Sequence, residues 1–296
     1  MVDRSRLETE IGPVSDGLGF SRLSPFGGFG SRAALLDKPA NPLAAFFSHP
    51  LTLRILSALI LFAAWEWAAR IPISPAFPSF IETMIGLWSM LADLSLIKAF
   101  GITLQPLAIG LVLSTILGVT IGVAMGLNDK AEWLASPIFI IAQAAPLAAL
   151  IPLIVFAYGI GLTAKTLVVC IMAMPVIVLN SFAAVRHTPV SLVEMGRSFL
   201  ASRRQVIMKV VLPAASPVIF AGLRLGCAAG FIGAILAELL ITPTGVGDII
   251  TYNRSIAQYP KMYAAILSII VFSVLFIELI ERVEVTLFRP EKRARK

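Results

Sequence analysis

Long apolar stretches alternate with short polar segments along most of this chain. Mostly apolar residues fill the stretches 52–70, 102–126, 133–158, 163–185, 217–240 and 262–285. A helix needs about 20 such residues to cross the hydrocarbon core of a bilayer. The pattern therefore predicts an all-α polytopic membrane protein, in which a transmembrane domain over 51–288 contains about six transmembrane helices.

The two ends of the chain differ from this domain in composition. Residues 1–50 are rich in Gly, Ser and Pro and carry mixed charge, which is typical of a flexible tail. They hold no apolar core of the kind found in a signal peptide, so we expect no cleavage there. The basic segment 289–296 is expected to lie on anionic lipid headgroups.

Small residues recur at helical spacing in two of the expected spans. The positions are Gly110, Gly118, Gly122 and Gly126 in one span, and Gly222, Gly226 and Gly230 in another. Such spacing lets a second helix backbone approach closely, which is how membrane helices associate. We expect helix packing within the chain, with an interface between two copies as the alternative.

The third expected span is interrupted by prolines. Pro146 and Pro152 fall inside 133–158, and each removes a backbone hydrogen bond from the helix. Broken membrane helices often line transport paths. These two prolines are therefore candidates for a path or gate.

A basic polar segment, 185–216, separates two strongly apolar spans. Ser191 with Glu194, and Ser202 with Gln205, have the spacing of capping boxes. We expect two short helices here, at 191–199 and 203–211, the second ended by Pro213. A segment with this much order between two spans suggests a rigid lever that a partner can contact.

Charge placement orients the chain. Hydrophobic residues make up 58% of it and charged residues 14%, with a net charge of +7. If the N-terminus is cytoplasmic, the outer segments hold only a few cations, namely Arg70, Lys98, Lys165, Arg254 and Lys261. This asymmetry fits the positive-inside rule. Both termini and the 185–216 segment are thus expected in the cytoplasm, and the basic character indicates membrane lipid rather than nucleic acid as its partner.

Candidate chemistry within the chain is sparse. Cys170 and Cys227 lie in apolar spans, His49 and His187 are isolated, and no cluster has metal-ligand spacing. No Gly-x-x-x-x-Gly-Lys-Ser/Thr stretch is present that could cradle a nucleotide phosphate. We therefore expect no bound cofactor or metal and no catalytic residue in this chain.

Two ionisable residues in the spans, Arg224 and Glu238, are further candidates for a path or gate. An ion-coupled secondary transporter, the alternative function, needs such groups deep in the membrane. These two lie near opposite ends of one span, which disfavours a proton relay. The absence of paired carboxylates within a span disfavours a membrane-embedded enzyme. Arg224 could attract an anion, although an arginine near a cytoplasmic interface more often extends to the headgroups.

The segment from Glu194 to Ser202, followed by Leu212-Pro213 and Pro217, resembles the EAA loop of permeases from binding-protein-dependent ABC importers. The likeness extends over about 100–288 and includes Gly245-Val246-Gly247. Within that family it is most similar to the nitrate, sulfonate, taurine and bicarbonate group.

The resemblance implies a permease subunit in the bacterial inner membrane, with 186–213 as a cytoplasmic two-helix coupling loop. The residues implied to contact a cytoplasmic ATPase dimer are Glu194, Gly196, Arg197, Leu200, Ala201, Ser202 and Pro213. ATP and Mg²⁺ would bind in that ATPase, so this chain would not itself be an enzyme. A periplasmic solute-binding protein and a second copy of the chain are the other implied partners. The solute would be small and anionic, and would cross by alternating access.

One departure from the family pattern concerns the turn of this loop. Leu200 stands where the family has glycine. A glycine between two short helices commonly takes the left-handed conformation, which costs another residue about 1–2 kcal/mol. Either this turn has a different geometry or Leu200 is strained.

Overall fold

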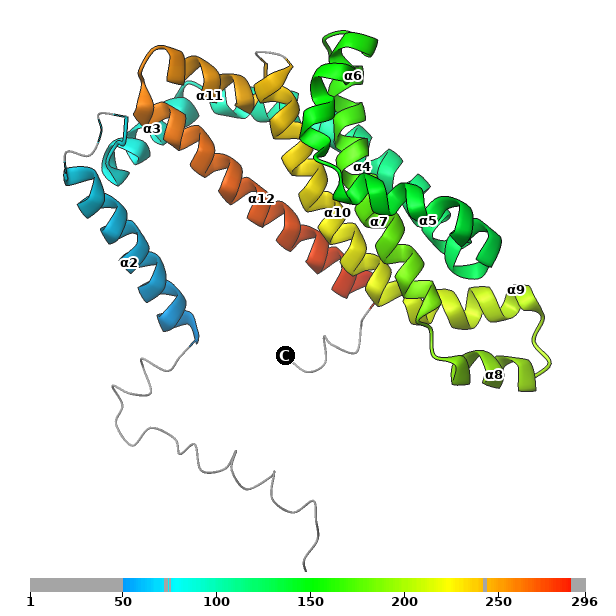
Figure 1. Cartoon of the computed structure of the whole chain (residues 1–296). Helices are drawn as coiled ribbons and strands as arrows, with labels where there is room; N and C mark the ends of the chain where they lie inside the picture. Colours follow the sequence, from blue (N-terminus) through cyan, green and yellow to red (C-terminus); the bar gives the residue numbers. More distant parts are fainter. Residues whose placement is uncertain (1–49, 72–73, 75, 242–243, 289–296) are drawn as a thin grey trace, which may run out of the picture. The chain divides into compact units, whose positions relative to one another are not determined.

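A computed structural model describes residues 50–71, 74, 76–241 and 244–288 of the chain, and in these residues the secondary structure is helical throughout (Figure 1). The chain divides into two compact units, Met1–Ala63 and Ala64–Lys296. The first described helix passes from one unit into the other, and the packing below is that of the second unit. The expected tails, 1–50 and 289–296, lie outside the described residues except for Pro50.

The helices follow one another with short connections. In chain order they are α2 (Pro50–Arg70), α3 (Phe80–Ala92), α4 (Ser95–Leu127), α5 (Asp129–Ala144), η2 (Leu147–Leu150), α6 (Ile151–Tyr158), α7 (Leu162–Arg186), α8 (Val190–Ser198), α9 (Arg203–Val206), η3 (Ile207–Val211), α10 (Leu212–Leu240), α11 (Val246–Ser255) and α12 (Tyr259–Phe288). In the described part of the chain, 5 helices are long and apolar enough to cross a membrane, or up to 6 if a bent pair forms one span. The prediction of an all-α membrane fold with about six transmembrane helices is confirmed.

The bent pair occupies the third expected span. α5 and the η2–α6 segment meet at an angle of 91°. Ala145, directly before Pro146, has an extended backbone with φ −68° and ψ 147°, the conformation that a following proline ring favours over the helical one. The interruption expected at Pro146 is thus a sharp bend between two helices.

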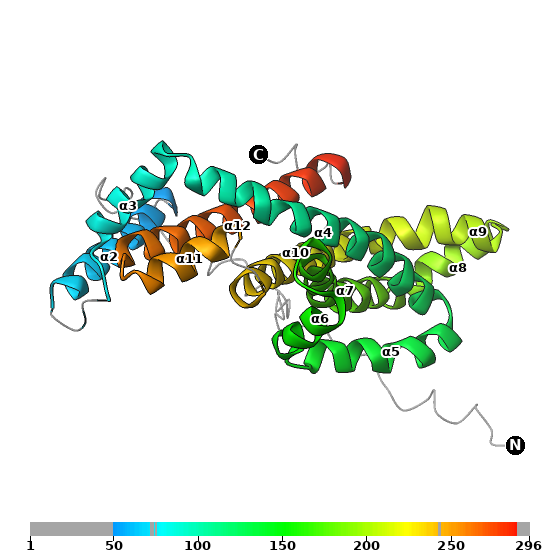
Figure 2. The same ribbon diagram turned by 90° about the horizontal axis from the view of Figure 1, so that it is seen from above.

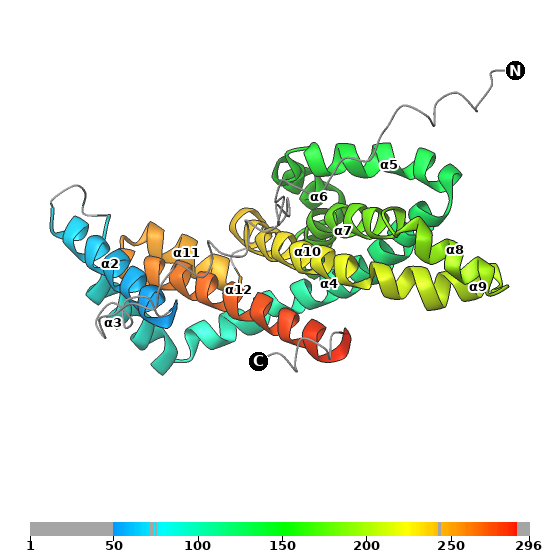
Figure 3. The same ribbon diagram turned by 90° about the horizontal axis from the view of Figure 1, so that it is seen from below.

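α7 lies at the centre of the second unit and packs against both α4 and α10, which also contact each other. α5 lies on the side of α7 away from α12 (Figures 2 and 3). The core between α4, α7 and α10 consists of large aliphatic and aromatic side chains, including Leu107, Ile177 and Phe231.

Glycines allow this close packing. A Cβ atom at Gly110 would lie 2.5 Å from Val169 Cγ1, and one at Gly122 would lie 2.5 Å from the Val178 carbonyl oxygen. The neighbours of Gly118, Gly126, Gly222 and Gly226 are also on α7, whereas Gly230 first meets Leu111 on α4 and then Val169. Both sets of glycines therefore serve contacts within the chain.

The glycine contacts predict that alanine lowers stability at some positions of α4 and not at others. Gly122→Ala places a methyl group against the backbone of α7, and overpacking of this kind costs about 1–3 kcal/mol. We expect a lower melting temperature for this variant, measured by intrinsic fluorescence of the purified chain in detergent.

Gly101→Ala is the matched control on the same helix. A Cβ there meets no atom within 4 Å, so we expect a stability equal to or above that of the parent, because alanine favours a helix over glycine by about 1 kcal/mol. Equal melting temperatures for the two variants would contradict a tight α4–α7 contact.

Candidate functional site

The segment 186–213, expected to be the coupling loop, forms a helical hairpin that follows α7. α8 and α9 lie at the end of α7 and α10 opposite to α6 and α11 (Figure 1). The second helix of the hairpin does not stop where expected. α9 continues through the wide turn η3 into α10, so that Arg203–Leu240 is one apolar helical stretch.

The prediction that Pro213 ends the second helix is therefore wrong. Pro213 occupies the first turn of α10, directly after η3, which is a π-helix. In a π-turn each carbonyl bonds the N–H five residues ahead, and the first turn of a helix tolerates a residue without an N–H. The helix consequently passes through Pro213.

Of the two capping boxes expected in this hairpin, only one forms. Ser202 Oγ accepts a hydrogen bond from Gln205 N at 3.4 Å, and Gln205 Oε1 accepts one from Ser202 N at 2.8 Å. The box predicted at Ser191 is wrong, because α8 begins one residue earlier, at Val190. Pro189, with its φ fixed at −54°, is the N-cap residue and leaves Ser191 inside the helix.

The turn between the two helices has the geometry that usually requires glycine. Leu200 has φ +55°, and its N–H donates to the Arg197 carbonyl at 2.8 Å. The Ala201 N–H donates to the Gly196 carbonyl at 3.2 Å. These two bonds form a Schellman motif with leucine at the left-handed position. Of the two possibilities left by the sequence, the structure has the strained one.

α8 has one packed face and one exposed face. Val193 packs against the cluster of Val185, Val206 and Val211, and Gly196 faces Val206. On the other face Glu194 and Met195 are exposed, as are Phe199 and Leu200 beyond the end of the helix, with 80% and 94% of their surfaces accessible. An apolar stripe beside a carboxylate on a short helix is suited to a groove in a partner.

A second group of polar residues is buried at the opposite end of the spans. Glu238, 2% exposed near the end of α10, accepts hydrogen bonds at Oε2 from Thr103 Oγ1 (2.9 Å) and Gly247 N (3.0 Å). Lys165 Nζ lies 3.7 Å from Glu238 Oε1 and donates to Thr244 Oγ1 at 2.7 Å. This ion-pair cluster joins α4, α7 and α10 to the residues that lead into α11.

The Gly-Val-Gly sequence is shaped by this cluster. Gly245 has φ +85°, and a Cβ there would overlap Glu238 Oε1. A Cβ at Gly247 would lie 2.5 Å from Glu238 Cβ. Both glycines thus let the chain pass over the buried carboxylate.

Sequence reasoning missed Lys165 as a member of this site. The charge pattern places it in an outer segment, whereas the structure buries it in the first turn of α7, with 4% exposure. The signal available was a lone lysine among apolar residues, together with a lone carboxylate, Glu238, in a different span. Distance along the sequence concealed the pairing.

The other candidates for a path or gate lie apart from one another. Arg224 Nη1 forms an ion pair with Glu281 Oε2 at 2.9 Å. The carboxylate of Glu281 offsets the positive charge that Arg224 would offer to an anion. Pro146 and Pro152 are exposed at the bend between α5 and α6. The structure does not bring these residues into one site with Glu238, which is enclosed by protein.

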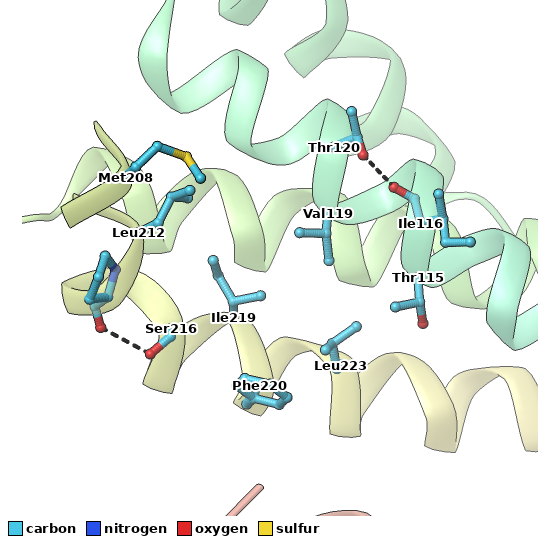
Figure 4. A pocket seen from close by; sticks show the side chains of 11 residues that line it. Thr115, Ile116, Val119, Thr120, Met208, Leu212, Ser216, Ile219, Phe220 and Leu223 are labelled. Atoms are coloured by element: carbon cyan, nitrogen blue, oxygen red, sulfur yellow. Dashed lines mark hydrogen bonds between the residues drawn. The ribbon is translucent and has the colours of Figure 1, made fainter. Parts of the chain in front are cut away.

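A groove lies between α4 and the start of α10 (Figure 4). It has a volume of about 810 Å³, and its lining includes Val119, Ile219 and Leu223 together with the hydroxyls of Thr120 and Ser216. Thr120 Oγ1 donates to the Ile116 carbonyl at 2.6 Å, and Ser216 Oγ donates to the Pro213 carbonyl at 2.9 Å. The residues that line this groove carry no charge, so it offers no counter-charge to an anion.

The chain matches known proteins over the region that contains these sites. The model of the family described as "Binding-protein-dependent transport system inner membrane component" matches residues 115–286, more than half of the chain. The aliphatic sulfonates transport permease protein SsuC of Bacillus subtilis is 27% identical over 233 residues, which cover 77% of this chain and 84% of SsuC.

Two further relatives differ in what their names say they transport. The taurine transport system permease protein TauC of Escherichia coli is 28% identical over 68% of this chain and 75% of TauC. The riboflavin transport system permease protein RibX of Chloroflexus aurantiacus is 34% identical over 44% of this chain and 49% of RibX. A solved structure of the MetNI methionine ABC transporter in inward-facing conformations has a similar fold, with a TM-score of 0.51 and 22% identity over 62% of this chain and 94% of the solved one.

Because Leu200 has a left-handed backbone, we expect that glycine at position 200 does not destabilise the fold. Leu200→Gly removes a strain of about 1–2 kcal/mol and adds about 0.5–1 kcal/mol of chain entropy to be lost on folding. We expect the variant to fold with a melting temperature equal to or slightly above that of the parent. Phe199→Gly, at the neighbouring exposed position with φ −83°, is the control and should be less stable than the parent. A large loss of stability in Leu200→Gly would contradict the left-handed turn.

The buried ion pair predicts strong coupling between its two members. Lys165→Met leaves the Glu238 carboxylate buried without a cation, and breaking a buried pair costs about 3–5 kcal/mol. Adding Glu238→Gln to this variant removes the unpaired charge, so the double variant should be more stable than Lys165→Met alone. Thermal melting of the single and double variants, combined in a double-mutant cycle, measures this coupling.

Lys98→Met is the control for loss of a positive charge. Lys98 is exposed, so its replacement should leave the melting temperature nearly unchanged. Additive effects of the Lys165 and Glu238 variants would show that the two side chains do not interact.

Proposed function

We propose that a separate ATPase dimer drives this chain through its cytoplasmic hairpin, because the chain belongs to the family of binding-protein-dependent transport system inner membrane components. It is a multi-pass permease subunit of an ABC importer, and its relatives are permease subunits rather than enzymes.

The exposed face of α8 is the observation that carries the proposal. Met195 and Phe199 are four residues apart and therefore lie on one side of the helix, next to Glu194. Leu200 extends the same apolar surface at the turn. Seated in a cleft of the ATPase, this surface would lose its contact with water, and Glu194 would supply a charge at its edge.

Movement of α8 would reach the spans through packed contacts. Gly196 and Val193 rest on the Val185, Val206 and Val211 cluster, and the helix that begins at Arg203 continues to Leu240. Closure of the ATPase would therefore push a connected body rather than a loose loop. That body would alternate between inward- and outward-open states, with ATP and Mg²⁺ bound by the ATPase.

The remaining partners and the orientation are inferred from the family and the charge pattern. A periplasmic binding protein would deliver solute at the end that carries α6 and α11, and a second copy of the chain would complete the path. Both termini would face the cytoplasm, as the positive-inside rule indicates. The membrane would be the bacterial inner membrane.

We infer a small anionic solute, such as a sulfonate. SsuC and TauC, whose names specify aliphatic sulfonates and taurine, support this class. A neutral aromatic solute is the second candidate, favoured by the uncharged groove between α4 and α10 and by the name of RibX. In either case selectivity would rest mainly with the binding protein.

Charge reversal on α8 tests the coupling. In cells that also express the cognate ATPase, Glu194→Arg should reduce the amount of ATPase that purifies with the chain by about tenfold, the effect of losing roughly 1.4 kcal/mol of binding free energy. Glu194→Gln separates loss of charge from repulsion, and Gln258→Arg adds a charge at the exposed turn before α12 as a control. Equal ATPase recovery with all four chains would overturn the role of Glu194.

Solute uptake by proteoliposomes containing the whole transporter tests the substrate class. We expect ATP-dependent uptake of a radiolabelled alkanesulfonate, competed by taurine and not by riboflavin. Uptake of riboflavin alone would replace the anionic class by the aromatic one and leave the coupling intact.

A further inference from the structure

A polar hollow lies where the hairpin meets the ends of α4 and α7. Its volume is about 600 Å³, and three arginines line it: Arg186, Arg197 and Arg203. We propose that this hollow binds the phosphodiester headgroup of an anionic phospholipid. This proposal does not depend on the function proposed above.

Two of the arginines have charge to offer a ligand. In the described part of the chain no carboxylate lies within 4.0 Å of Arg197 or Arg203. Arg186 differs, because its guanidinium pairs with Asp129 at 2.8 Å and with Glu132 at 3.5 Å. The hollow therefore holds an unbalanced positive charge contributed by α8 and α9.

Guanidinium groups are suited to phosphate. Each presents planar N–H donors that match two oxygens of a phosphate at once, and these charge-assisted hydrogen bonds are stronger than neutral ones. Arg197 lies in the last turn of α8 and Arg203 is the first residue of α9. A phosphate between them would contact both helices of the hairpin.

The rest of the lining indicates a lipid rather than a free ion. Leu127, Val193 and Val211 form an apolar part of the hollow, beside the residues at which α4 and α7 end. Span ends lie at the depth of lipid headgroups. A phospholipid can place its phosphate on the arginines and its hydrocarbon portion on the apolar residues, whereas inorganic phosphate leaves the apolar part in contact with water. Basic pockets at the cytoplasmic ends of transmembrane helices bind anionic headgroups in this way.

Native mass spectrometry of the full-length chain in detergent, titrated with dioleoyl phosphatidylglycerol, tests the proposal. The Arg197→Gln/Arg203→Gln double variant should raise the dissociation constant by at least about tenfold, since the loss of even one of the two contacts corresponds to a tenfold change. Arg204→Gln/Lys209→Gln is the matched control, with the same charge removed from exposed residues of the same segment that do not line the hollow. The dissociation constant of this control variant should stay within about a factor of two of the parent value.

Three results would overturn the proposal. An equal loss of lipid affinity in both double variants would mean that the lipid binds a diffuse basic surface. Unchanged lipid affinity in both variants would mean that the hollow is not a binding site. Displacement of phosphatidylglycerol by inorganic phosphate at equal concentration would assign the hollow to a free ion. Should the first double variant fail to fold, Arg197→Lys keeps the charge but removes the planar fork, and unchanged lipid affinity in that variant would contradict bidentate binding.

Discussion

The close approach of α7 to both α4 and α10 is the constraint on which the rest of this structure depends. At Gly110, Gly122 and Gly226 a single methyl group would overlap atoms of α7. In a bilayer the lipid tails are as apolar as the side chains, so helices are held together by close van der Waals contact rather than by exclusion of water. Three helices packed in this way form a body that carries the α8–α9 hairpin at one end and the buried Glu238–Lys165 cluster at the other.

Each end of this three-helix body places a different kind of group. At one end Glu238 and Lys165 meet only because α10 and α7 are in contact, and Thr103 of α4 donates a hydrogen bond to Glu238. At the other end α7 and α10 support the hairpin through Val185 and Ala215. Since Arg203–Leu240 is one helical stretch, the second helix of the hairpin and Glu238 belong to the same continuous element.

Much of this arrangement follows from the sequence, for reasons that are local. The lengths of the apolar stretches predict the spans, and the spacing of the small residues predicts the glycine contacts. Ser202 followed three residues later by Gln205 predicts the cap of α9. What could not be predicted depends on tertiary contacts or on competing local geometry. Lys165 finds Glu238 only after folding, and the π-turn before Pro213 depends on how α9 continues into α10. Ser191 loses its cap because Pro189 starts the helix earlier.

Leu200 combines a strained backbone with an exposed side chain. Its left-handed backbone costs about 1–2 kcal/mol, and its exposed side chain recovers almost nothing from burial within the chain, because 94% of its surface remains accessible. Glycine would satisfy the same Schellman hydrogen bonds without the strain. Folding of the isolated chain therefore gives no reason for leucine at this position. Contact with the proposed partner would give such a reason, because burial of a leucine side chain contributes about 1.5–3 kcal/mol, enough to offset the strain.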